Sequence, residues 1–370
     1  MRRPWQDAEG LLCVRLDAAG DLLMTTPALR ALKQAAQGRR ITLLTSPAGA
    51  EAAALVPDVD SVIAYEAPWM KATGSRTDPR SDLELAERLR AERFDAAVIF
   101  TVYSQSPLPA ALLCHLADIP LRLAHCRENP YALLTDWVRE PEPDDGVRHE
   151  AQRQLDLVAE VGAVASETAL SLEVPADARR RALEALHESG HEPGAPWIAV
   201  HPGASAPSRR YPWMPEAAAL LQRETGHRLV VTGGPGEAEA AEAVCAATAR
   251  GEAVSLAERL TFAELAALIE AAPLLVCNNS GPAHVAAAVG TPTVVLYALT
   301  NPQHTPWQSP ARVLSHDVPC RWCYRSVCPE GHHDCLRKVE PRDVAAAAIE
   351  LLPPGGVAAA PPEGAALGAD

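Results

Sequence analysis

The chain has 370 residues, of which 48% are apolar and 22% are charged. This length exceeds what one hydrophobic core usually holds, so two domains of about 150–180 residues are expected. The formal net charge of −14 excludes a general nucleic-acid binder, because phosphate contacts need a basic face.

Strand and helix patterns alternate through the amino-terminal half. The apolar run at residues 11–16 predicts a strand, residues 17–21 a loop, and residues 22–33 an amphipathic helix. Further strands are predicted at 41–44, 61–65 and 94–100. Polar residues predict exposed loops at 69–82, which could cover a substrate cleft or be mobile, and at 141–146, and a charged helix is predicted at 83–92. Such alternation favours a parallel, doubly wound sheet.

A second α/β series follows a linker that we place near residues 175–196, around a predicted helix at 176–189. Strands are predicted at 197–200, 228–232, 253–256, 274–277 and 293–296, mostly followed by a loop and a helix. We therefore expect two α/β domains, residues 1–175 and 176–352, with a cleft between them. The Pro/Gly/Ala-rich tail at 353–370 predicts disorder.

Membrane and export signals are missing from the sequence pattern. No stretch approaches about 18 consecutive apolar residues, and the amino terminus leads into a strand without a signal-peptide pattern. We therefore expect a cytoplasmic protein without a transmembrane segment.

Residues 277–297 carry the most informative motif. A short apolar strand runs into the turn and N-cap residues Asn278, Asn279, Ser280 and Gly281, and His284 then falls in the first turn of a predicted helix at 282–289. Backbone N–H groups and the positive helix end would there face a phosphate. The alternative is an ordinary strand-to-helix connection.

Two carboxylates, Asp17 and Asp21, lie between the first strand and the first helix. Either one could act as a general base. Asp21 could equally be a helix N-cap without a catalytic role, because a carboxylate is stabilised at a helix start.

Two further loops follow strands in the second half. Residues 201–205, ending at Ser205, precede the Arg209-Arg210 pair, and Gly233 and Gly234 lie in a glycine-rich turn. Basic residues beside a small-residue loop suit a diphosphate leaving group. The arginines could also be a surface pair, and a lone glycine turn is a weak signal. Together with the Ser280 turn, the loops would line a nucleotide pocket.

The motifs VRLDAAGD (14–21), TTPAL (25–29), HPGA (201–204) and NSGPAH (279–284) together resemble the bacterial heptosyltransferase family, family nine of the glycosyltransferases. The resemblance runs from about residue 11 to residue 352. It implies a GT-B fold, in which two Rossmann-like doubly wound domains face a central cleft, with the acceptor on the amino-terminal side and the sugar nucleotide on the carboxy-terminal side.

The resemblance also implies roles for individual residues. The family inverts at the anomeric carbon, needs no metal or other cofactor, and its base maps to Asp21, which makes Asp17 the weaker candidate. Arg209 takes the place of the basic residue on the diphosphate, usually lysine, and Ser280, Gly281 and His284 match the phosphate-holding helix start. Asn279 stands where members of the family often carry aspartate. This difference puts in doubt which sugar nucleotide is preferred as donor.

The function implied is transfer of a sugar, heptose from ADP-heptose, to a hydroxyl of a glycan or glycolipid such as lipopolysaccharide core. Such an acceptor implies peripheral contact with the inner face of the cytoplasmic membrane. Three alternatives stay open: another sugar nucleotide, a catalytically silent nucleotide-binding protein of the same fold, and an NAD-dependent oxidoreductase. The last lacks a GxGxxG motif after the first strand.

Four of the nine cysteines form a cluster, Cys320, Cys323, Cys328 and Cys335, with two histidines between the last two. A structural zinc, packed reduced thiols, or a disulfide would each explain it. A metal here is expected to be remote from the chemistry. The other five cysteines are scattered, mostly among apolar neighbours, and are expected to be buried small hydrophobes.

Overall fold

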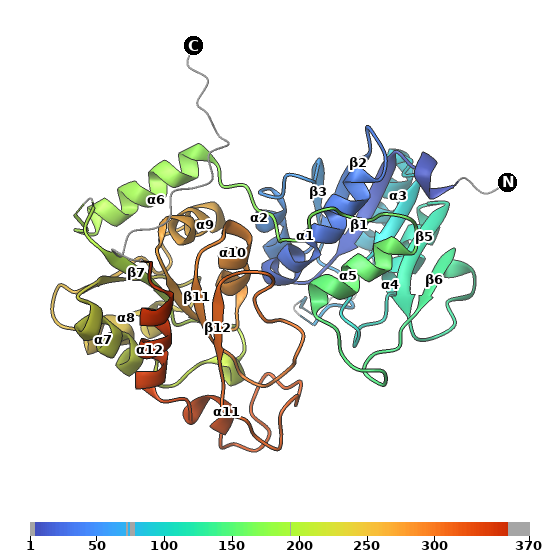
Figure 1. The fold of residues 1–370 in the computed structure, drawn as a ribbon. Helices are drawn as coiled ribbons and strands as arrows, with labels where there is room; N and C mark the ends of the chain where they lie inside the picture. The colour runs from blue at the N-terminus through green and yellow to red at the C-terminus, as the bar shows by residue number, and fades with distance from the viewer. Residues whose placement is uncertain (1–3, 72, 75–77, 193, 354–370) are drawn as a thin grey trace, which may run out of the picture.

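The computed structural model describes residues 4–71, 73–74, 78–192 and 194–353. The described residues form two lobes that meet along a seam, the blue-to-green lobe and the yellow-to-red lobe of Figure 1. The predicted disorder of the tail concerns residues that, apart from 353, lie outside the described part.

The amino-terminal lobe is built on a parallel sheet with the strand order β3-β2-β1-β4-β5-β6. Its strands are β1 (Gly10–Arg15), β2 (Arg40–Thr45), β3 (Ser61–Ala64), β4 (Ala96–Ile99), β5 (Leu121–Cys126) and β6 (Asp136–Arg139). Its helices are α1 (Ala19–Gln34), α2 (Pro47–Ala53), α3 (Arg80–Glu92), α4 (Leu108–Leu116) and α5 (Glu150–Ala159), with 3₁₀ turns η1 (Trp5–Asp7) and η2 (Tyr131–Leu133).

The carboxy-terminal lobe repeats this topology, with the strand order β12-β11-β10-β7-β8-β9. Its strands are β7 (Trp197–His201), β8 (Arg228–Val231), β9 (Ala253–Ser255), β10 (Leu275–Asn278), β11 (Thr293–Leu296) and β12 (Ala311–Leu314). Its helices are α6 (Ala176–Glu188), α7 (Met214–Thr225), α8 (Ala238–Ala247), α9 (Phe262–Ala271), α10 (Gly281–Val289), α11 (Asp334–Arg337) and α12 (Pro341–Leu351), with the 3₁₀ turn η3 (Pro207–Arg209).

The central strands β1, β4, β7 and β10 are buried almost throughout, as parallel strands covered on both faces by helices must be. Both strand orders change direction beside the first strand of the lobe, β1 or β7. Ligands of such sheets bind at the carboxyl ends of the strands at this switch point. The residues after β1 and β7, together with those after β10, therefore lie where a ligand of this fold would bind.

The predicted doubly wound architecture is confirmed, and every predicted strand is present. The inner strand β5 and the edge strands β6 and β12 were not predicted. β6 and β12 are half-exposed, so their sequences lack the apolar run that marks a buried strand. Helix α1 begins three residues earlier than predicted, and α3 starts at Arg80, inside the predicted loop 69–82. The domain limits of 1–175 and 176–352 stay a prediction.

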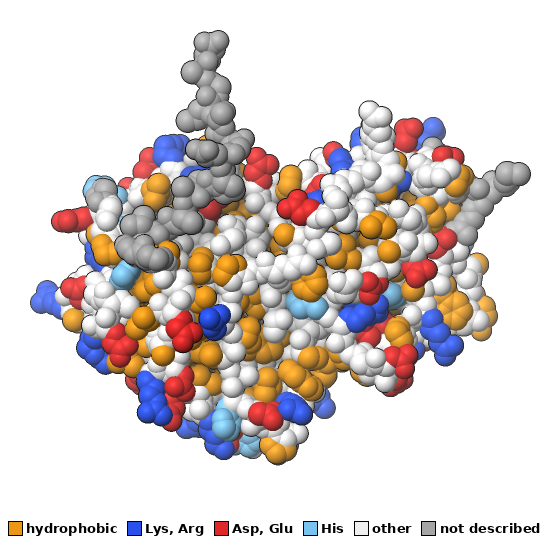
Figure 2. Space-filling model, in the orientation of Figure 1, with side chains coloured by type: hydrophobic (Ala, Val, Ile, Leu, Met, Phe, Trp, Pro, Cys, Tyr) orange, Lys and Arg blue, Asp and Glu red, His pale blue; other side chains and the backbone are white. Residues whose placement is uncertain are grey.

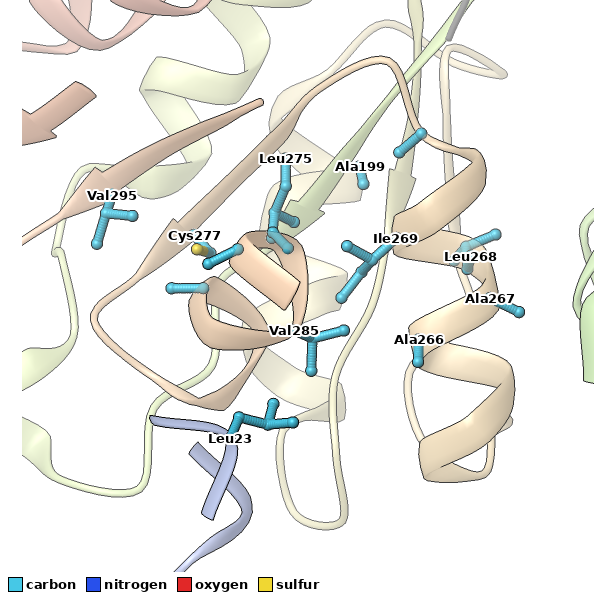
Figure 3. Packing of buried hydrophobic residues seen from close by; sticks show 14 of the residues in the cluster. Leu23, Ala199, Ala266, Ala267, Leu268, Ile269, Leu275, Cys277, Val285 and Val295 are labelled. Atoms are coloured by element: carbon cyan, nitrogen blue, oxygen red, sulfur yellow. The ribbon is translucent and has the colours of Figure 1, made fainter. Parts of the chain in front are cut away.

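The two lobes share one apolar cluster across the seam. Leu23 of α1 packs beside Val285 of α10, among residues of α9 and β10 (Figure 3). Met24, Leu55 and Ala151 from the first lobe belong to the same cluster. The amino-terminal ends of α1 and α10 therefore lie together, and the residues before and inside their first turns form the candidate site.

The surface in view in Figure 2 carries basic side chains interspersed with acidic ones over its described part. No helix among the described residues combines the length and the apolar character needed to cross a bilayer.

Candidate active site

Asp21 lies in the first turn of α1 at the seam between the lobes. The helix begins at Ala19 with Ala18 in the N-cap position, so Asp21 is the third helical residue. The interpretation of Asp21 as an N-cap is therefore wrong. Its side chain keeps 23% exposure. Burial raises the pKa of the Asp21 carboxyl, and the nearby charge of Arg15 opposes this shift only in part.

Arg15, the last residue of β1, is fully buried among three carboxylates. Its Nη1 donates to Glu150 Oε1 at 2.7 Å, its Nε lies 3.0 Å from Asp17 Oδ2, and its Nη2 lies 3.4 Å from Asp21 Oδ1. Arg15 therefore fixes Asp21 from within its own lobe. The pKa of Glu150 is lowered by Arg15 despite burial, so the cluster holds an ionised carboxylate behind the candidate base.

Asp17 is engaged more tightly than Asp21. Besides Arg15, its Oδ1 accepts a hydrogen bond from Gln105 Nε2 at 2.7 Å. Burial raises the pKa of Asp17 as well. A carboxylate held by two protein partners is less available to an acceptor hydroxyl, and this geometry favours Asp21 as the base.

The start of α10 packs directly onto the first turn of α1, which carries Asp21. A Cβ added to Gly20 would lie 2.8 Å from His284 Cδ2 and 3.5 Å from Gly281 Cα, so only glycine fits there without a shift. His284 is buried and its Nδ1 has no hydrogen-bond partner within the described chain. Burial lowers the pKa of His284 to about 3, so the imidazole is neutral at physiological pH.

The turn before α10 matches the predicted phosphate cradle in outline. Ser280 occupies the N-cap position, but its hydroxyl donates to Asn278 O at 3.3 Å and caps no amide of the first turn. The Asn279 side chain accepts a hydrogen bond from Ala298 N at 3.4 Å and is 5% exposed. Asn279 therefore supports the loop after β11 in addition to bordering the helix start.

Asn278, which the sequence marked only as a turn residue, ties two loops together. Its Nδ2 donates to Pro202 O at 2.7 Å, and its Oδ1 accepts from Tyr211 N at 3.0 Å. The end of β10 is thereby fixed to the loop that follows β7 and that leads to Arg209.

Arg209 ends the 3₁₀ turn η3 at the same seam. Its positive charge is near enough to Asp21 to oppose, in part, the rise in pKa that burial causes there, and it adds a little to the lowering of the pKa of His284 by burial. Within the part of the chain that the structure describes, no carboxylate forms an ion pair with Arg209. An unpaired guanidinium beside a helix start is suited to an anion.

Gly233 and Gly234, which the sequence predicted for the pocket, lie beside Glu237. Gly234 N donates to Glu237 Oε2 at 2.8 Å, and a Cβ at Gly233 would lie 3.2 Å from Glu237 Cβ. The Glu237 carboxylate also lies 3.3 Å from His201 Nε2, and this contact lowers the pKa of Glu237. Ser205, the remaining predicted pocket residue, is exposed. The glycine-rich turn is thus folded around a carboxylate in this structure.

A cavity of about 330 Å³ opens beside Asp17 in the amino-terminal lobe. Trp69 and Met70 form part of its apolar lining with Phe100, and Gln105 supplies a polar group. Lys71 lies at the same cavity and donates to Ser326 Oγ of the other lobe at 3.1 Å. The described part of the predicted loop 69–82 therefore borders a pocket near the candidate base, while residues 72 and 75–77 lie outside the described part.

The cysteine cluster lines a separate cavity of about 20 Å³ together with His332 and His333. All nine cysteines are unpaired in the described residues. No group of three or more His, Cys, Asp or Glu side chains there is placed so that it could hold a metal ion. The side chains as arranged therefore do not form a zinc site.

The cysteine-bearing segment lies against the turn that carries Arg209, although a metal in this segment was expected to be remote from the chemistry. Ser208, next to Arg209, donates from N to Ser326 O at 3.0 Å and from Oγ to Arg325 O at 2.8 Å. His333 Nε2 lies 2.6 Å from Ser208 O. The cysteine-bearing segment therefore holds the turn that carries Arg209.

Arg15, Glu150 and His304 were missed by the sequence reasoning. The only signal was their residue type, since 135 residues separate Arg15 from Glu150. His304 lies in the loop after β11, and its Nε2 is 3.9 Å from Asp21 Oδ1. Nothing in the local pattern marks such a pairing.

Known proteins resemble this chain over most of its length. Residues 83–333 match the model of glycosyltransferase family 9 (heptosyltransferase). Lipopolysaccharide heptosyltransferase 1 of Pseudomonas aeruginosa is 25% identical over 86% of this chain and 87% of its own.

Solved structures show the same fold. A family 9 glycosyl transferase from Veillonella parvula superposes with a TM-score of 0.79 at 23% identity, covering 95% of this chain and 98% of its own. The E. coli ADP-heptose lps heptosyltransferase II gives a TM-score of 0.73 at 24% identity, covering 93% and 98%. The fold is thus GT-B, and the chain belongs to glycosyltransferase family 9, the heptosyltransferases.

Proposed function

We propose that this glycosyltransferase moves heptose from ADP-heptose to a hydroxyl of a lipopolysaccharide-core acceptor, with inversion and without a catalytic metal. The observation that carries the proposal is that Asp21 of one lobe lies within electrostatic reach of the unpaired Arg209 of the other. A base in one lobe thereby faces an anion site in the other. The names of the E. coli and P. aeruginosa relatives supply the donor and the acceptor class.

In the proposed reaction Asp21 removes the proton of the acceptor hydroxyl. The freed oxygen attacks the anomeric carbon, and the bond from that carbon to the diphosphate breaks, its electron pair leaving with ADP. A single displacement of this kind inverts the configuration. Because burial raises the pKa of Asp21, the carboxylate is a stronger base than an exposed aspartate would be.

The leaving diphosphate gains negative charge as the bond breaks. Arg209 and the amino-terminal end of α10, where Ser280 leaves the first turn without a side-chain cap, would stabilise that charge. We assign the diphosphate to Arg209, Ser280, Gly281 and His284. Asn279, Ser205, Gly233 and Gly234 are assigned to the wider donor pocket.

We assign the acceptor to the cavity beside Asp17. Its apolar lining includes Trp69, whose ring could stack on a sugar, while Gln105 and Lys71 offer polar contacts. Contact with the inner face of the membrane would follow from a lipid-linked acceptor and is part of the same proposal.

Structural zinc at the four cysteines also stays a proposal. Binding would require the thiols to turn toward one another. Elemental analysis of protein purified without chelator tests it: about one zinc per chain supports the site, and zinc-free protein that is fully folded and active contradicts it.

The central experiment incubates the protein with a panel of sugar nucleotides and lipopolysaccharide cores that carry different numbers of heptoses. Transfer from ADP-heptose alone supports the proposal, and transfer from another nucleotide revises the donor. Asp21→Ala should abolish transfer while ADP still binds. Wild-type protein that binds ADP but transfers to no core would instead support a catalytically silent nucleotide-binding protein.

A further inference from the structure

His304 of the carboxy-terminal lobe approaches the carboxylate of Asp21. Its Nε2 lies 3.9 Å from Asp21 Oδ1, and its side chain is 16% exposed. None of the family motifs includes this residue. Its role therefore has to be argued from its surroundings.

The loop around His304 is fastened to α5 of the opposite lobe on both sides. Gln303 O accepts a hydrogen bond from Glu150 N at 3.0 Å, and Thr305 O lies 2.8 Å from His149 Nε2. Within its own lobe, His304 N donates to Tyr297 Oη at 3.3 Å. The imidazole is thus held at the seam by its neighbours in the chain, whichever contacts its own ring makes.

The ring atom that faces Asp21 has no hydrogen-bond partner. His304 Nε2 is buried, and within the described chain nothing donates to it or accepts from it. Leaving a buried polar atom unpaired is costly. An approach of about 1 Å would bring Nε2 and Asp21 Oδ1 to ordinary hydrogen-bond distance, about 2.8 Å.

We propose that His304 is a positioning residue for the catalytic base: its Nε2–H donates to Asp21 Oδ1 when the two lobes close on substrate. Arg15 Nη2 contacts the same oxygen from the other lobe, at 3.4 Å. Oδ1 is then held from both sides, and Oδ2 is directed toward the acceptor hydroxyl. The base reaches its working orientation only when both lobes are in place.

The protonation state of His304 fits this role. Burial, together with the charges of Arg209 and Arg15, lowers its pKa to about 4. The ring is therefore neutral at physiological pH and donates without competing for the substrate proton. The acceptor proton moves to Asp21 Oδ2, and His304 keeps its own proton throughout.

The inference rests on the proposed transferase reaction and is tested by its pH dependence. The titratable and charged groups that face Asp21 or His304 from all neighbouring elements are Arg15, Asp17, His149, Glu150, Arg209 and His284. All of them are unchanged in a variant at position 304. A shift of the acid limb, the low-pH fall of kcat in the pH profile, therefore reports the lost contact.

The experiment compares His304→Ala and His304→Gln with wild type, measuring kcat against pH with ADP-heptose and lipopolysaccharide core. His304→Ala should lower kcat about tenfold or more and move the acid limb upward by about one pH unit, because ionised Asp21 loses a donor. The Kd for ADP should not change. His304→Gln keeps an N–H donor at a similar reach, so its acid limb should lie at the wild-type pH.

His149→Asn is the matched control. His149 lies at the same seam, but both ring nitrogens have protein partners, Thr305 O and Ala151 N. Asn retains the helix cap while losing the contact across the seam. Because Glu150 N and Tyr297 Oη still hold the loop at Gln303 and His304, this variant should lower the melting temperature without moving the acid limb.

Each outcome decides one point. A limb that moves equally in His304→Ala and His149→Asn would show that any loosening of the seam has this effect, and would overturn the positioning role. Unchanged kcat and pH profile in His304→Ala would do the same. Failure of wild-type protein to transfer or hydrolyse ADP-heptose would reject the proposed function itself, a result that the wild-type assay gives separately.

Discussion

Gly20 and His284 touch across the seam so closely that a methyl group on residue 20 would lie 2.8 Å from the imidazole. Gly20 directly precedes Asp21, and His284 belongs to the helix start assigned to the diphosphate. The distance between the proposed base and the proposed diphosphate site is therefore set by close contact of Gly20 with Gly281 and His284 in the first turn of α10.

Gly20→Ala should reduce transfer by about tenfold or more, because displaced reacting groups lose rate steeply. The control is Gly10→Ala in β1, where a Cβ would meet Asp95 at an ordinary 3.8 Å. Initial rates and melting temperatures of both variants check this. Full activity in Gly20→Ala would show that the lobes are farther apart in the working enzyme.

Asp21→Asn should abolish transfer yet leave the protein as stable as wild type, or more stable. A carboxyl whose pKa is raised by folding costs stability when ionised, and that cost is present at pH 7 and fades as pH falls through the raised pKa. Removing the charge should raise the melting temperature at pH 7 by about 2 °C and less at pH 5. A large drop would mean that Arg15 needs Asp21 to be stable.

The pH dependence of transfer should follow Asp21. The reaction needs the ionised carboxylate, so kcat falls as pH drops through a pKa that lies above the ordinary aspartate value of about 4. His304 and His284, with pKa values lowered to about 4 and about 3, stay neutral over most of this range. An acid limb at or below pH 4 would contradict the assigned environment.

Arg209→Ala should weaken ADP binding about tenfold to a hundredfold, the usual worth of a charge-assisted contact to phosphate. Arg209→Lys should keep most of the affinity. Its neighbour Arg210 donates to Ala204 O and is exposed, so Arg210→Ala is the control and should change affinity little. Calorimetry with ADP measures all three, and equal losses at both positions would point to a diffuse basic surface.

Arg15→Met should destabilise the protein by about 3–5 kcal/mol, since the buried Glu150 and the partly buried Asp17 and Asp21 lose their shared cation. Urea unfolding gives the free energy. Arg15→Lys keeps the charge but cannot reach all three carboxylates, so its free energy of unfolding should lie between those of Arg15→Met and wild type. A loss below about 1 kcal/mol in Arg15→Met would show that the carboxylates take up protons instead.

The sequence predicted those parts of the molecule whose signal is local. Buried strands such as β1 and β10 are continuous apolar runs, and the turn at Ser280 combines small residues with a following proline. Half-exposed strands such as β12 lack that pattern. Asp21 was placed at the correct helix start, but which residue caps the helix depends on a boundary that sequence fixes only to within a few residues.

The parts that escaped prediction depend on tertiary contacts. In the sequence Arg15 is simply a charged residue at the end of a strand. Its burial is compensated by the ion pair with Glu150 of α5, which forms only in the folded chain. His304 reads as one polar residue in a loop. The engagement of Ser208 by Ser326 and His333 joins segments more than a hundred residues apart, and no spacing rule connects them.

The apolar cluster that contains Leu23 and Val285 has a thermodynamic consequence. Because α1 contributes its side chains to the core beneath the other lobe's sheet, neither half can melt without exposing apolar surface of its neighbour. The lobes therefore unfold as one cooperative unit. Nucleotide bound to the carboxy-terminal lobe alone would then protect the whole chain, including the acceptor side that it never touches.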